Sequence, residues 1–77
     1  MKKSKRQRQI ELLLRLLDRV NTSSLSKGLV RENTDWIHKK ISQVEGNVPA
    51  GGLTKHDMLH ANSMWDQHSR QVHPMFN

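Results

Sequence analysis

Residues 9–20 form the densest apolar segment of the chain, and they constrain its fold more than any other stretch. At 100° per residue the apolar side chains fall on one stripe, which comprises Ile10, Leu13, Leu14, Leu17 and Val20. Leu12 and Leu16 widen the stripe to roughly half of the circumference, and no Gly or Pro interrupts the segment. We therefore predict a helix over residues 8–21. So wide an apolar face must pack against two elements of its own chain or against another chain.

The same stripe is the predicted site of self-association or partner binding. The chain has 77 residues and no cysteine. A domain of this size buries only about 60% of its extended surface, so a second chain would add stability that disulfides cannot supply here. We expect the five residues of the stripe to form a dimer or partner interface.

The second predicted helix covers residues 34–45. Asn33 or Thr34 can serve as its N-cap, and Gly46 follows its last turn. The sequence also allows a short separate helix over residues 25–30, just before it. The segment that follows the first predicted helix is rich in short polar side chains, which favour turns and caps. We therefore expect a loop there.

The third predicted helix covers residues 54–72. It follows a loop over residues 47–52 that holds one proline and two glycines, which a helix does not readily accommodate. Thr54 and Asp57 have the spacing of a capping box at the start of the helix.

Together these segments predict an all-α fold, a small bundle of three principal helices. A mobile basic N-terminal arm (residues 1–7) precedes a single helical domain (residues 8–77), and the whole could form a helical dimer. No segment alternates apolar and polar residues as a strand does. No apolar run approaches the length of a membrane span, and charged residues interrupt any signal-peptide core. We expect a soluble protein that is cytoplasmic or, as the alternative, nuclear.

Positive charge is concentrated at the N-terminus. Five of the 13 Lys and Arg residues lie within the first eight positions, namely Lys2, Lys3, Lys5, Arg6 and Arg8. A basic arm neutralises phosphates and releases counterions, which is the main source of non-specific affinity for nucleic acid. We predict that these five residues bind nucleic acid, helped by Lys39 and Lys40 in the second helix. The same charge could instead attract an acidic protein or an anionic membrane surface, or merely keep the chain soluble.

The sequence offers little for catalysis or for metal binding. His56 and His60 are spaced i, i+4, so they are weak candidates for a metal site that lacks a third ligand. The serines stand in no recognisable nucleophile context, and Gly51-Gly52 lacks the lysine of a phosphate-binding loop. We expect no enzymatic activity, no cofactor and no small-molecule substrate.

These observations favour a small regulatory or accessory protein that binds nucleic acid through its basic arm, for example in transcription, and that self-associates through its first helix. A helix-turn-helix over residues 24–44 is disfavoured. Its turn glycine should be followed at a set distance by an apolar residue, and taking Gly28 as that glycine puts Thr34 at this position. The alternative function is a protein–protein adaptor or inhibitor that docks its Leu-rich helix on a larger protein target.

Overall fold

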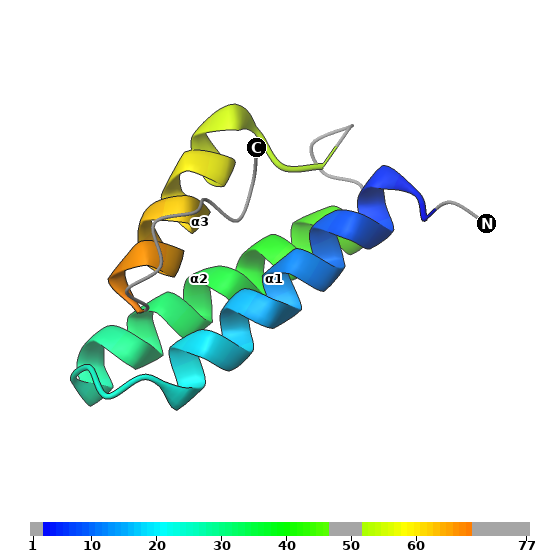
Figure 1. Ribbon diagram of the computed structural model, residues 1–77. Coiled ribbons are helices and arrows are strands. Elements are labelled where there is room, and N and C mark those ends of the chain that lie inside the picture. The colour runs from blue at the N-terminus through cyan, green and yellow to red at the C-terminus, as the bar shows by residue number, and fades with distance from the viewer. Residues whose placement is uncertain (1–2, 47–51, 69–77) are drawn as a thin grey trace.

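The computed structural model describes residues 3–46 and 52–68, which fold into three α-helices (Figure 1). Helix α1 spans Lys5–Thr22, α2 spans Lys27–Glu45 and α3 spans Lys55–Gln67. Helices α1 and α2 lie side by side, and α3 is set at an angle to both (Figure 1). These ranges contain no β-strand. The predicted all-α fold with three principal helices is confirmed.

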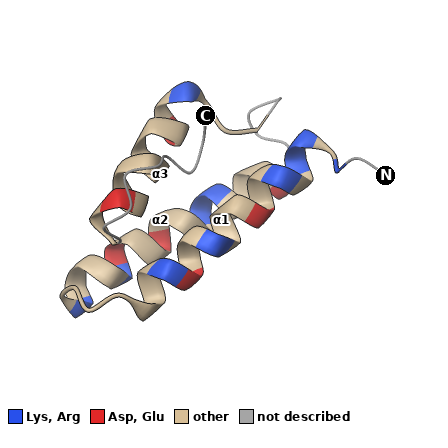
Figure 2. Ribbon diagram, viewed as in Figure 1, with Lys and Arg blue, Asp and Glu red and all other residues tan. Residues whose placement is uncertain are grey.

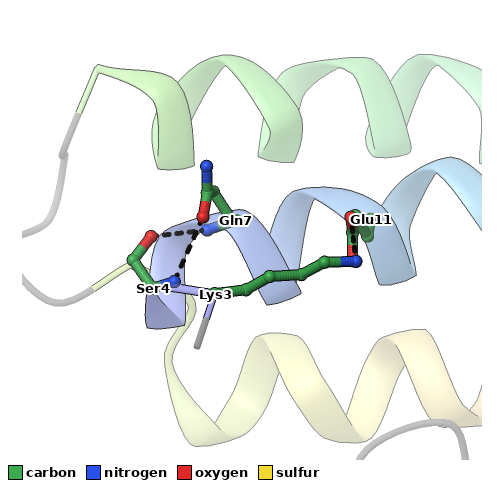
Figure 3. Close-up of polar contacts among 4 residues, drawn as sticks. All are labelled: Lys3, Ser4, Gln7 and Glu11. Carbon is green, nitrogen blue, oxygen red and sulfur yellow. Dashed lines mark hydrogen bonds and ion pairs between the residues drawn. The ribbon is translucent and has the colours of Figure 1, made fainter. Parts of the chain in front are cut away.

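Helix α1 begins three residues earlier than predicted, because Ser4 caps it. The Ser4 hydroxyl accepts a hydrogen bond from the Gln7 backbone, and the Gln7 side chain accepts one from the Ser4 backbone (Figure 3). This capping box satisfies two backbone donors that a helix start otherwise leaves free. Lys5 and Arg6, predicted to lie in a mobile arm, therefore belong to the first turn of α1. Lys2 lies outside the described residues.

Helix α2 is one continuous helix, where the sequence suggested a short helix followed by one over 34–45. Ser26 is the N-cap, and its hydroxyl accepts a hydrogen bond from the Leu29 backbone. The predicted caps, Asn33 and Thr34, lie inside the helix and make tertiary contacts instead. The Thr34 hydroxyl, for example, donates to the Asn21 side chain at 3.3 Å.

Helix α3 has the predicted capping box. Thr54 and Asp57 exchange side chain–backbone hydrogen bonds at 3.1 Å in both directions. The helix ends at Gln67 with His68 as its C-cap, so it is shorter than the predicted 54–72. Positions 69–72 of that prediction, like most of the predicted loop 47–52, lie outside the described residues.

One apolar core joins the three helices. Its buried members are Leu13, Leu16, Val20, Ile37, Val44, Leu53, Ala61 and Met64. Two of the predicted interface residues, Leu13 and Val20, are 0% exposed in this core. Ile10 and Leu17 are partly buried against it, and only Leu14, at 49% exposed, points its surface to solvent. Most of the wide apolar face of α1 is therefore covered by the chain's own helices.

A first polar junction fastens the N-terminal end of α3 to α1. Gln9 is 4% exposed, and its Oε1 accepts a hydrogen bond from the Leu53 backbone at 3.2 Å. Gly52 has a φ of 87°, which only glycine adopts readily. A Cβ at Gly52 would collide with Gln9 Oε1. We call Gln9, Gly52 and Leu53 the N-terminal junction of α3.

A second polar junction fastens the C-terminal end of α3. The His68 ring lies 2.7 Å from Ser23 Oγ through Nδ1 and 2.7 Å from Asn33 Nδ2 through Nε2. Because an amide nitrogen only donates, Nε2 accepts from Asn33, and Nδ1 carries the proton that it donates to Ser23. Burial lowers the pKa of His68 below its ordinary value of 6.5. We call Ser23, Asn33 and His68 the C-terminal junction of α3.

Candidate nucleic-acid interface

Charge is unevenly distributed over the three helices (Figure 2). Residues 3–22, which contain α1, carry six basic and two acidic side chains. The remaining described residues carry five of each sign. The net positive charge of the described chain is therefore a property of α1 and the residue before its N-cap.

Four of these cations recur along one edge of α1, which we call the basic edge: Lys5, Arg8, Arg15 and Arg19. At 100° per residue they fall within about 80° of the helix circumference, and at 1.5 Å per residue they extend over about 21 Å. Arg19 marks the side on which the edge lies, because its guanidinium stacks on Trp65 of α3. The Arg19 end of the edge thus borders α3.

The two acidic residues of α1 offset the basic edge only in part. Lys3 Nζ lies 2.7 Å from Glu11 Oε1 (Figure 3), so these two charges largely neutralise each other. Both side chains are well exposed, so the pair adds little to stability. Asp18 is the remaining acidic residue of the helix, and it lies between Arg15 and Arg19 in the sequence.

An open groove of about 560 Å³ lies at the C-terminal half of the basic edge, where α1 meets Trp65 of α3. It is lined by Leu14, Arg15, Asp18, Arg19, Thr22 and Trp65. The Arg19 guanidinium carbon lies 3.4 Å from the centre of the Trp65 ring, a close cation–π contact. Sequence reasoning missed Arg15, Arg19 and Trp65 as site residues. The spacing of Arg15 and Arg19 from Arg8 was the available signal, but it acquires meaning only once the position of α3 is known.

The two lysines of α2 that the sequence assigned to nucleic-acid binding are placed differently. Lys40 Nζ lies 3.0 Å from Asp57 Oδ1, and the two side chains are only 14% and 11% exposed. Lys40 also approaches the ring of Trp36, at 5.6 Å. Its charge is therefore engaged between α2 and α3 and is not available to a phosphate. Lys39 is exposed on α2, a different helix from the one that carries the basic edge, and its role stays a prediction.

The ion pair with Lys40 also determines the charge state of Asp57. Burial raises the pKa of the Asp57 carboxyl, but the hydrogen bonds from Lys40 and Thr54 outweigh this effect. They hold the pKa below its ordinary value of 3.8. Asp57 is thus a charged group with structural partners on two sides.

The histidine pair that the sequence singled out is not assembled into a metal centre. The described residues contain no group of three His, Cys, Asp or Glu side chains placed to hold a metal. His56 is exposed, and the His60 ring packs against Trp36 with 4.5 Å between ring centroids. The sequence did not single out His68. Of the three histidines it is the one with two side-chain hydrogen bonds, to Ser23 and Asn33.

Comparison with known protein families, curated proteins and solved structures finds no match to this chain. No helix in the described ranges is both long enough and apolar enough to cross a membrane. Any function must therefore be argued from the charge and geometry of the chain itself.

Proposed function

We propose that this protein is a small regulatory or accessory protein that binds nucleic acid through the basic edge of α1. The observation that carries the proposal is the segregation of charge, with six basic residues against two acidic ones in residues 3–22 and an even balance in the rest of the described chain. The proposal is for a binding function rather than a catalytic one.

The geometry of the basic edge suits a sugar–phosphate backbone. Its length of about 21 Å matches roughly six nucleotides of one DNA strand, which rises 3.4 Å per nucleotide. Three of its four side chains are exposed and the fourth, Arg19, lines the groove. Because α1 is capped at Ser4, the first cations stand on a formed helix rather than on a loose arm. They can therefore meet phosphates with less loss of conformational entropy.

The alternative, an adaptor that docks its Leu-rich face on a larger protein, has less support from the structure. Leu13 and Val20 are fully buried, so most of that face is occupied by the chain's own core. The large apolar side chains that remain exposed in the described ranges are Leu14, Leu25 and Leu59, which belong to three different segments. They supply no continuous docking stripe on α1.

The test is fluorescence anisotropy with labelled duplex DNA over a salt series. Binding should weaken steeply with salt, with a slope of about 0.9 for each phosphate contact on duplex DNA. Replacing Lys5 and Arg8 together with alanine should lower the affinity and reduce the slope by about 0.9 for each phosphate that is no longer neutralised.

The matched control removes two exposed charges from α2, through Lys27→Ala together with Arg31→Ala. This double variant has the same net charge as the variant that lacks Lys5 and Arg8, and it should bind DNA nearly as well as the unsubstituted chain. An equal loss of affinity in both pairs would mean that binding follows overall charge and not the basic edge. Absence of binding even at low salt would reject the proposal.

A further inference from the structure

We propose that the groove between α1 and α3 holds one unpaired nucleotide, so that the protein prefers single-stranded nucleic acid to a duplex. The base would stack on the Arg19 guanidinium, and its phosphate would contact Arg15. This inference rests on the proposed function and adds to it the class of nucleic acid that is bound.

The Arg19–Trp65 stack supplies the platform. One face of the guanidinium covers the Trp65 ring at 3.4 Å, and the residue also lines the groove. In the described part of the chain, Arg19 Nη1 is buried without a hydrogen-bond acceptor. Its contact with the Trp65 ring is the interaction that positions the guanidinium among the described residues. An arginine plane held in this way is a surface on which unpaired bases stack.

The other groove residues suit a whole nucleotide, with its base, better than a ligand that offers phosphates alone. Arg15 provides a cation for the phosphate, while Leu14 provides apolar surface beside it. Asp18 would repel a phosphate, but its carboxylate can accept a hydrogen bond from the N–H groups of a base. The Thr22 hydroxyl already donates to the carbonyls of Asp18 and Arg19, at 3.0 and 3.2 Å.

The same composition argues for an unpaired base and against other anionic partners. A duplex keeps its base faces stacked inside, so it could use Arg15 but not the Arg19 plane. The acidic side chains of a peptide have no planar ring to stack, and Asp18 would repel their carboxylates. The groove volume of about 560 Å³ lies within the range of ordinary small-ligand sites.

The direct test is a nuclear magnetic resonance titration of the full chain, which at 9.0 kDa is well suited to it. The probe is an oligothymidylate of about eight nucleotides, a length within the usual site sizes for single strands. The Arg19 Nε–H signal should move upfield because a base ring lies over it, and the Trp65 indole N–H signal should shift with it. The Trp36 indole is the internal reference, since it packs against His60 on the α2 side, and its signal should stay in place.

A variant tests the stacking surface separately from its charge. Arg19→Lys keeps the positive charge but removes the planar group. It should weaken oligothymidylate binding about fivefold or more, while duplex binding changes little. Arg8→Lys is the matched control outside the groove, and it should affect both ligands equally and slightly. The titration of the unsubstituted chain stands even if Arg19→Lys destabilises the fold.

The outcomes separate this inference from the proposed function. If duplex and single strand bind equally and the Arg19 and Trp65 signals do not move, the groove inference is overturned while nucleic-acid binding stands. If neither nucleic acid binds, both proposals fail. If a glutamate-rich peptide shifts the groove signals as strongly as oligothymidylate does, the groove is a protein-binding site and the inference is overturned.

Discussion

The two ends of α3 are attached to the rest of the protein by different chemistry. At the N-terminal junction, a buried amide, Gln9, binds the Leu53 backbone beside a glycine with positive φ. At the C-terminal junction, the His68 imidazole bridges Ser23 and Asn33. The first attachment depends on shape and has no titrating group of its own. The Lys40–Asp57 ion pair beside it loses its charge only below the ordinary aspartate pKa of 3.8. The second depends on the imidazole being neutral.

This difference shows which contacts fix the orientation of a short helix such as α3. Helix α3 buries few large side chains, so its orientation relies on polar contacts at both ends as well as on Ala61 and Met64. The N-terminal junction should be sensitive to any added atom and indifferent to pH. The C-terminal junction should tolerate changes of size better but weaken in acid. Each expectation can be tested by altering one junction while the other serves as the reference.

The largest effect is expected from Gly52→Ala. The new Cβ would collide with Gln9 Oε1, and the φ of 87° is strained for alanine. Strain of this kind, together with the rupture of a buried hydrogen bond, should cost about 2 to 4 kcal/mol in free energy of unfolding. That is a large part of the stability of a domain of this size. Urea denaturation followed by circular dichroism measures it.

Gly28→Ala is the matched control for that substitution. A Cβ at Gly28 meets no atom within 4 Å, and the residue is exposed in the first turn of α2. Alanine there should stabilise the chain by about 0.5 to 1 kcal/mol, because it restricts the unfolded state and favours the helix. If both alanines had the same effect, the N-terminal junction would not be closely packed around Gly52.

An intermediate effect is expected from Gln9→Ala. The substitution leaves the Leu53 backbone N–H without its acceptor in a buried position, which should cost about 1 to 3 kcal/mol. Gln67→Ala, at an exposed position of α3, is the control and should change little. The double variant with Gly52→Ala sharpens the result. Gly52→Ala should cost less in the Gln9→Ala background because the atom it strikes is gone, and purely additive costs would argue against the collision.

The sequence predicted the local features of this fold and missed the contacts between distant segments. The Thr54–Asp57 capping box is a four-residue pattern, and it was recognised. Ser4 and Gln7 form the same pattern, but it was overlooked within a run of charged residues. Asn33 and Thr34 resembled caps because their short polar side chains favour caps in general. In the folded chain they bind His68 and Asn21 instead.

The candidate site was predictable only in part, for a similar reason. The concentration of basic residues near the N-terminus is visible in the sequence, and Lys5 and Arg8 remain in the proposed site. Whether Lys40 is free or paired depends on Asp57, which lies 17 residues away on another helix. Likewise, Arg19 becomes part of a groove only because α3 places Trp65 against it. No local pattern encodes such pairings.

The smallest effect, and the one that distinguishes the junctions by pH, is expected at His68. Its pKa is lowered in the folded chain, so the unfolded chain binds the proton more readily. The stabilisation is therefore fully present above the unfolded value of 6.5 and is lost as the pH falls from there towards the folded pKa. Protonated Nε2 can no longer accept from Asn33, which should cost about 1 kcal/mol or less.

Urea denaturation at several pH values should show this decline, and His68→Gln should flatten it. Asp57 does not interfere, because its contribution is lost only below its unfolded value of 3.8. An unchanged pH dependence in His68→Gln would assign the decline to another histidine and would remove the contrast between the two ends of α3.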